Sequence, residues 1–240
     1  KVDMIKAITF DLWNTLFENK SFSKIRLDFL ENFLQKKNYD YNFKTIKDSY
    51  ENSFKFLDYK ESGFDFHHIY IEERISSMVN KLKLQISDAE KKIIKKNLEE
   101  AMLKDPPLLK KSVKRTLEIL SENYKIGLIS NTGITPGYVI IDIFQKYDIL
   151  RYFQVTIFSD EIGYYKPHSL LFEYALKKLQ SKPEHAVHIG DLLHTDVKGA
   201  KSYGMRAIWF NDTNQVKAPE IQPDYEVKEM LEIVDIIKTF

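Results

Sequence analysis

The chain has 240 residues, of which 43% are hydrophobic, and it carries 36 basic against 35 acidic side chains. This apolar content is enough for a real core and excludes a globally disordered chain, while a net charge of +1 excludes a strongly basic nucleic-acid binder. The absence of cysteine excludes disulfides, thiol catalysis and cysteine-ligated metal sites.

The sequence shows no feature of a membrane or secreted protein. No apolar run approaches the ~20 residues that span a bilayer, and the N-terminus lacks a signal-peptide pattern. We therefore expect a cytoplasmic protein that acts on a small molecule, with no nucleic-acid or membrane partner. The sequence does not indicate an oligomeric state.

An apolar strand is predicted at residues 5–10, and more than a hundred residues separate it from the next one. A crossover between neighbouring parallel strands usually takes a few dozen residues. The intervening chain shows four stripes of apolar side chains at helical spacing, and a capping-box pattern at Ser87 opens the last one. We therefore expect an inserted four-helix domain over residues 18–107, placed as a lid on a core formed by residues 1–17 and 108–240. The four stripes are Phe22, Ile25, Phe29, Leu30 and Phe33; Ile46, Tyr50, Phe54 and Leu57; Ile71, Ile75, Met78 and Leu82; and Ile94, Leu98 and Met102.

Short apolar strands alternate with helix-like segments in the rest of the chain. Such alternation predicts an α/β fold with a doubly wound parallel sheet, which the strand at residues 5–10 must join because alone it has no partner. Strands are predicted at 125–129, 155–158, 186–189, 207–210 and, at an edge, 225–227, with helices at 113–123, 137–145, 170–179 and 195–203 and a closing helix after residue 227.

Polar side chains follow the predicted strand ends. In open α/β sheets ligands bind outside the carboxyl ends of the strands, so these side chains should meet at one rim. Clustered carboxylates suit Mg²⁺, and one of them can act as a nucleophile. Hydroxyl, backbone N–H and lysine groups can hold the oxygens of a transferring phosphoryl group. The residues concerned are Asp11, Ser130, Asn131, Lys166, Asp191 and Asp196.

These residues lie in segments that resemble, in order, the four motifs of the haloacid dehalogenase-like (HAD) hydrolase superfamily. The segments are residues 11–16 (DLWNTL), Ser130-Asn131, Lys166-Pro167, and Gly190-Asp191 followed by Asp196. The resemblance covers essentially the whole chain. It implies a Rossmann-like core with a helical cap of the C1 type inserted after the first motif.

The resemblance also implies roles for single residues. Asp11 would be the nucleophile, and Lys166 would act beside it in catalysis. Ser130, Asn131 and Lys166 would contact the substrate phosphate. Mg²⁺ would be bound by Asp11, Asp191 and the backbone carbonyl of Trp13, with Asp196 in support. The function favoured is a Mg²⁺-dependent phosphatase that acts on a small phosphorylated molecule through an aspartyl-phosphate at Asp11.

Trp13 departs from the phosphatase pattern. The family's phosphatases carry a second aspartate here, which protonates the leaving group, and an indole cannot do that work. The 2-haloacid dehalogenases carry an aromatic residue here and displace halide from the substrate with their aspartate, without metal. They also replace Asp191 with an uncharged residue, so Asp191 favours the phosphatase. A weakly active or non-catalytic ligand-binding protein is the third alternative.

Three further residues have structural interpretations. His188 lies within a predicted strand, where we expect a buried, hydrogen-bonded side chain. Arg26 and Arg74 are expected to form solvent-exposed ion pairs, rather than to bind an anionic part of the substrate.

Overall fold

The computed structural model describes residues 4–53, 65–216 and 218–240. It contains a six-stranded sheet in the order β3-β2-β1-β4-β5-β6, in which every pair of neighbours is parallel. The predicted α/β fold is therefore confirmed, and each predicted strand is present with shifts only at its ends. The strands are β1 (Ala7–Phe10), β2 (Lys125–Ser130), β3 (Val155–Phe158), β4 (Ala186–Gly190), β5 (Arg206–Phe210) and β6 (Tyr225–Val227).

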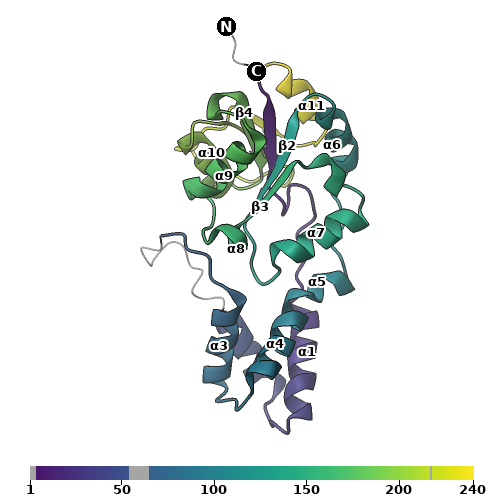
Figure 1. Cartoon of the computed structure of the whole chain (residues 1–240), viewed down its shortest axis with the longest axis vertical. Coiled ribbons are helices and arrows are strands. Elements are labelled where there is room, and N and C mark those ends of the chain that lie inside the picture. Colours follow the sequence, from purple (N-terminus) through teal and green to yellow (C-terminus); the bar gives the residue numbers. More distant parts are fainter. Residues whose placement is uncertain (1–3, 54–64, 217) are drawn as a thin grey trace.

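Helices cover both faces of this sheet. In Figure 1, α9 and α10 lie on one side of the strands, and α6, α7 and α11 lie on the other. The helices are α6 (Val113–Ser121), α7 (Gly137–Lys146), the short α8 (Ser159–Ile162), α9 (Ser169–Leu179), α10 (Lys198–Ser202) and α11 (Glu232–Ile237).

The strands are apolar on both faces because each face packs against helices. Alternate residues of β5 divide between two hydrophobic clusters. Ile208 and Phe210 join the cluster that includes α6, α7 and α11, whereas Trp209 joins the cluster that includes α9. A strand covered on both faces reads as a continuous apolar run, which is why these strands could be predicted.

A separate group of helices forms the lower part of the molecule in Figure 1. The described helices of this group pack around a hydrophobic cluster that includes Leu30, Ile46, Ile75 and Leu98. A short helix, α5, then leads back toward α7. We call α1 to α4 the helical group; its members are α1 (Ser23–Lys36), α2 (Phe43–Asn52), α3 (Ile71–Lys81) and α4 (Asp88–Glu99), followed by α5 (Ala101–Lys104).

The capping box predicted at Ser87 is present. Its hydroxyl accepts a hydrogen bond from the backbone N–H of Glu90, whose carboxylate accepts one from the backbone N–H of Ser87. This reciprocal pair fixes the start of α4. Of the second predicted stripe, Phe54 and Leu57 lie outside the described residues.

Two local predictions differ in part from the structure. The buried stripe of α1 contains Leu27, Leu30 and Leu34, whereas Phe29 and Phe33 are only half-buried. The side chains at i, i+3 and i+7 face α2 and α4, so the two phenylalanines fall on the flank of that face. The single helix predicted at 195–203 is in fact a wider helical turn at Leu193–Val197 that continues into α10.

Among the described residues, no helix combines the length and the apolar character that crossing a membrane requires.

Candidate active site

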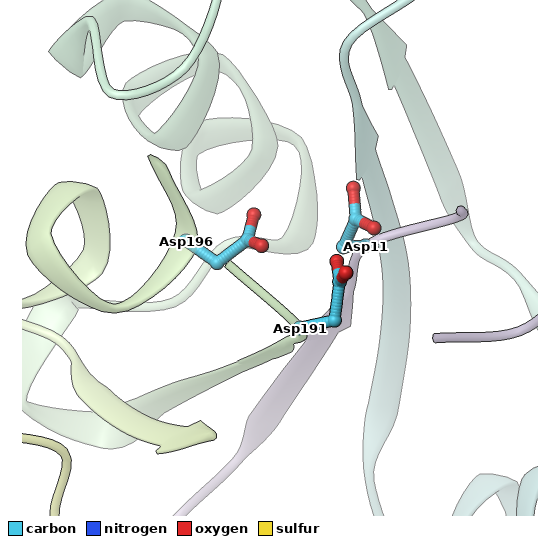
Figure 2. A group of neighbouring side chains, drawn as sticks. All are labelled: Asp11, Asp191 and Asp196. Carbon is cyan, nitrogen blue, oxygen red and sulfur yellow. The ribbon is translucent and has the colours of Figure 1, made fainter. Parts of the chain in front are cut away.

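Three buried carboxylates converge at the carboxyl edge of the sheet. Asp11 follows β1, Asp191 follows β4, and Asp196 lies in the helical turn after β4. Figure 2 shows their carboxylate groups gathered around one space. One oxygen from each lies within 4.8 Å of the others. As predicted, the strand ends bring together residues that lie up to 185 positions apart in the sequence.

Gly190 makes room for this arrangement. A Cβ atom on Gly190 would lie 2.3 Å from the carboxyl carbon of Asp196, far closer than non-bonded atoms approach a Cβ atom in real structures. The glycine before Asp191 thus lets the Asp196 side chain cross the end of β4 and reach the cluster.

Lys166 joins the cluster from the loop between α8 and α9. Its ammonium Nζ lies 2.6 Å from Oδ1 of Asp11 and 2.7 Å from Oδ1 of Asp196. It also donates to the carbonyl of Ile129 at 2.8 Å, and its side chain is 1% exposed. Each of its three N–H donors therefore has an oxygen partner, which a buried ammonium needs. Lys166 is therefore not one of the solvent-exposed surface lysines of this chain.

The charges at the rim shift one another's pKa. Burial raises the pKa of Asp11 to about 6, with Lys166 opposing the shift. Burial, and then the charges of Asp11 and Asp196, raises the pKa of Asp191 to about 8. The Asp196 carboxyl is also buried, but Lys166 and His188 outweigh that effect and hold its pKa well below the usual range.

Asp196 has no unoccupied carboxylate oxygen. Oδ1 accepts from Lys166 and contacts Nε2 of His188 at 3.4 Å, and Oδ2 accepts from the backbone N–H of Leu192 at 2.9 Å. His188 is buried, and its Nδ1 lies 2.9 Å from the hydroxyl of Thr9. The prediction of a buried, hydrogen-bonded His188 is confirmed.

Asp191 differs from the other two acids. No cation of the described residues lies within ion-pair distance of it, and its Oδ2 has no hydrogen-bond partner among them. The nearby Asn14, which has a positive φ of 56°, opposes part of the rise in the pKa of the Asp191 carboxyl. A buried carboxylate oxygen left open beside a second carboxylate is a suitable ligand for a divalent cation.

Ser130 and Asn131 lie where β2 ends. The Ser130 side chain is fully buried, and its hydroxyl contacts the carbonyl of Asn131 at 3.4 Å. The Asn131 amide makes two bonds to the backbone of Lys166: its Oδ1 accepts from the N–H at 2.7 Å, and its Nδ2 donates to the carbonyl at 3.3 Å. In this structure Asn131 therefore orients the loop that carries Lys166.

A pocket of about 340 Å³ opens above these residues. Trp13 is half-buried in its wall, and its ring lies 6.4 Å from the ring of Phe22, between centroids. The side of the pocket formed by the segment before α1, the first turn of α1 and the loop after β2 includes residues that were not predicted from the sequence to belong to the site. They are Asn19, Lys20, Phe22, Arg26, Gly133, Ile134 and Thr135.

The prediction that Arg26 and Arg74 are solvent-exposed was wrong. Arg26 is 7% exposed and Arg74 is 1% exposed. Arg26 donates to the carbonyl of Leu98 and to the hydroxyl of Thr135, and Arg74 donates to the carbonyl of Ser53. The two partners of Arg26 are neutral oxygens from distant parts of the chain, which no local sequence pattern reveals.

Similar proteins include phosphatases. Glyceraldehyde 3-phosphate phosphatase from Pyrococcus furiosus is 27% identical over 238 residues, which cover 98% of this chain and 93% of the relative. The crystal structure of a HAD phosphatase from Thermococcus onnurineus matches with a TM-score of 0.70 at 25% identity, over 97% of this chain and 98% of the other.

A dehalogenase has the same fold. The crystal structure of 2-haloacid dehalogenase from Pseudomonas syringae matches with a TM-score of 0.77 at 24% identity, over 98% of this chain and 99% of the other. The fold alone therefore does not separate the two activities.

A family model described as haloacid dehalogenase-like hydrolase matches residues 5–204, which include Asp11, Lys166, Asp191 and Asp196. The chain belongs to the haloacid dehalogenase-like hydrolases.

Proposed function

We propose that this hydrolase is a phosphatase that acts on small phosphorylated molecules, with Asp11 as the nucleophile and Mg²⁺ as the cofactor. The observation that carries the proposal is the buried Asp191 carboxylate beside Asp11, with its Oδ2 open. Similar proteins that match nearly the whole chain are named phosphatases, which supports the proposal.

The donor set fits a divalent cation. Three carboxylates this close repel one another unless a cation offsets their charge. Lys166 engages Asp11 and Asp196 but not Asp191, so its charge leaves the Asp11–Asp191 side of the cluster open. Asp11, Asp191 and the backbone carbonyl of Trp13 would hold Mg²⁺, and Asp196 would support the site from a position where both its oxygens are occupied. When bound, Mg²⁺ offsets the negative charge of the phosphoryl group and of the carboxylates.

Asp11 would attack the phosphorus atom through a carboxylate oxygen. A phosphorus–oxygen bond to Asp11 forms as the bond to the leaving alcohol breaks. Lys166 holds Oδ1 of Asp11 and fixes the orientation of the carboxylate. A water molecule then attacks the phosphorus atom, which releases phosphate and restores Asp11. Asn131 and Lys166 line the pocket and would contact the phosphoryl oxygens, whereas the Ser130 hydroxyl, which is buried and does not line the pocket, would have to turn toward them.

Trp13 would shape the first step. Its indole supplies no acid for the leaving alkoxide, which would take its proton from water, so esters with good leaving groups should react fastest. The helical residues 18–107 would act as a C1-type cap over a core of residues 1–17 and 108–240, and would exclude bulk water. Two contacts support this: the helical group supplies Arg26 to the pocket, and the segment before α1 supplies Phe22.

Hydrolysis of p-nitrophenyl phosphate tests the proposal. We expect release of p-nitrophenol with Mg²⁺ and loss of release with a chelator. Asp11→Asn should lower kcat by at least about 10⁴-fold, as removal of a covalent nucleophile does, while circular dichroism shows an intact fold. Asp28→Asn, an exposed aspartate on α1, is the matched control and should keep full activity.

Trp13 favours one alternative, halide displacement. If the wild-type protein releases no p-nitrophenol with Mg²⁺ but releases chloride from 2-chloropropionate in the presence of a chelator, the phosphatase proposal is overturned. If the protein turns over neither substrate but calorimetry still detects binding of Mg²⁺, the result would instead support a non-catalytic binding protein.

A further inference from the structure

Arg26 is a buried cation in the wall of the active-site pocket. It lies on the first turn of α1, is 7% exposed, and lines the same pocket as Asp11 and Asp191. The carboxylates enter this pocket from the sheet, whereas Arg26 enters it from the helical group. The mechanism proposed above gives Arg26 no role.

The hydrogen-bond partners of Arg26 do not neutralise its charge. Nε donates to the carbonyl of Leu98 at 2.9 Å, and Nη2 donates to the hydroxyl of Thr135 at 2.8 Å. Within the described ranges of the chain, no carboxylate lies within 4.0 Å of the guanidinium. Arginine stays protonated in proteins, and a buried charge is unfavourable unless it is paired.

The other cations of the pocket have counter-ions. Lys166 pairs with two aspartates, and Lys20 pairs with Asp105. Of the described cations that line the pocket, Arg26 alone therefore has only neutral acceptors around it. An anionic ligand would supply the counter-ion that the described residues do not provide for Arg26.

An aromatic wall connects this cation to the carboxylates. The guanidinium carbon of Arg26 lies 5.7 Å from the centre of the Phe22 ring, and Phe22 in turn contacts Trp13. Trp13 lies two positions after Asp11 in the sequence. A substrate with its phosphoryl group at Asp11 would thus run along Trp13 and Phe22 before its far end reached Arg26.

We propose that Arg26 binds a carboxylate at the end of the substrate remote from the phosphoryl group. The substrates are then small phosphomonoesters that also carry a carboxylic acid. A guanidinium binds a carboxylate through charge-assisted, often bidentate hydrogen bonds, and it does so better than an ammonium. This inference rests on the proposed phosphatase function and adds the substrate class.

A matched pair of substrates tests the inference on the wild-type protein. 3-Phosphoglycerate and glycerol 3-phosphate have the same carbon skeleton and differ in a carboxylate against a hydroxymethyl group. We expect kcat/KM to be at least about tenfold higher for 3-phosphoglycerate, as hydrogen bonds to a charged group provide. Equal values, or a preference for glycerol 3-phosphate, would overturn the inference while leaving the phosphatase function intact. A protein that releases no p-nitrophenol at all would instead overturn the proposed function.

Substitutions then assign the preference to Arg26. Arg26→Met keeps most of the apolar stem and removes the charge, so the ratio of the two kcat/KM values should fall to about one, mainly through a higher KM for 3-phosphoglycerate. Arg26→Lys keeps the charge without the fork and should retain part of the preference. Arg115→Met removes an exposed, ion-paired arginine of α6 and should leave the ratio at the wild-type value.

A purely structural role for Arg26 gives a different result. If its only role were to hold α4 and the loop after β2, Arg26→Met would lower kcat/KM for both substrates by the same factor and leave the ratio unchanged. That outcome would overturn the inference. If Arg26→Met does not fold, the wild-type ratio and Arg26→Lys still decide the question.

Discussion

Two buried cations face the same pocket in opposite electrostatic settings. Lys166 lies at the rim of the sheet, between the carboxylates of Asp11 and Asp196. Arg26 lies in the helical group, between a carbonyl and a hydroxyl. The lysine is neutralised within the protein, whereas the arginine is not. The rim thus has the charges that a reaction needs, and the helical group has a charge suited to a ligand.

The two regions also have separate hydrophobic clusters. The sheet has a hydrophobic cluster on each face, and the helical group has a separate one of its own. One connection between them is a short ladder, in which the backbone N–H of His68 donates to the carbonyl of Gly163 at 2.8 Å and that of Tyr165 donates to the carbonyl of Phe66 at 2.6 Å. This ladder ends next to Lys166. The segment that leads into α3 is therefore tied to the loop that carries Lys166.

The largest effect on stability is expected from removing the paired cation. Lys166→Met leaves two buried carboxylates without their counter-ion, which should lower the free energy of unfolding by about 3–5 kcal/mol and kcat by about 10²–10³-fold. Urea denaturation and the p-nitrophenyl phosphate assay measure the two effects. Lys114→Met removes an exposed ion pair with Asp148 and should change the free energy of unfolding by no more than about 1 kcal/mol. If both variants lose equal stability, the pairing at the rim does not stabilise the fold.

A smaller effect is expected where the two regions meet, at Trp13. Trp13→Asp introduces the missing acid, so kcat for glycerol 3-phosphate, which has a poor leaving group, should rise at least about tenfold, less than the ~10²–10⁴-fold of an evolved general acid. The gain for p-nitrophenyl phosphate should be much smaller, because its leaving group needs no proton.

Trp13→Phe is the control, since it keeps an aromatic ring against Phe22 without adding an acid. An equal rate increase in both variants would mean that removal of the indole, not the new carboxyl group, was responsible. If Trp13→Asp no longer folds while Trp13→Phe does, the main role of Trp13 is to pack against its neighbours.

The smallest effect concerns the connection at His68. This side chain is buried, with its Nδ1 3.1 Å from the hydroxyl of Ser159, and burial lowers its pKa to about 4. The unfolded chain, with a histidine pKa near 6.5, therefore binds the proton more readily between pH 6.5 and 4. Stability should fall as the pH drops through this range, by about 1 kcal/mol at pH 5.5 relative to pH 7.5.

His68→Asn keeps a polar atom near the position of Nδ1 and removes the titration. Denaturation of both proteins at pH 7.5 and pH 5.5 isolates the contribution of His68, because the other titrating groups are shared. The variant should lose about 1 kcal/mol less than the wild type over this interval. An identical loss in both proteins would show that His68 is not the group that titrates.

The sequence predicted the rim better than the opposite wall, for a physical reason. Asp11 and Asp191 directly follow short, mostly apolar strands that are buried on both faces, and parallel strands end at a common edge. Local patterns were therefore enough to bring these residues together. Arg26 is buried by contacts with Leu98 and Thr135, which lie 72 and 109 residues away in the sequence. No local pattern carries that information, and on a helix of mixed polarity Arg26 resembled an ordinary surface arginine.

The same distinction explains the details of the helices. The start of α4 depends on Ser87 and Glu90, which lie three positions apart in the sequence, and it was predicted. The buried face of α1 depends on where α2 and α4 lie, and its stripe was predicted about one residue out of place. The role of Asn131 in holding the Lys166 backbone likewise depends on how the loop after β2 meets the loop between α8 and α9.

The measurement that tests the central claim most directly is the identity of the covalent intermediate. The wild-type protein would be mixed with p-nitrophenyl phosphate and Mg²⁺, quenched in acid during turnover, digested and analysed by mass spectrometry. The account predicts a phosphoryl group on the peptide that contains Asp11, and none in the Asp11→Asn protein. A protein that turns over the substrate with the phosphoryl group on another residue, or with no phosphorylated peptide at all, would contradict it.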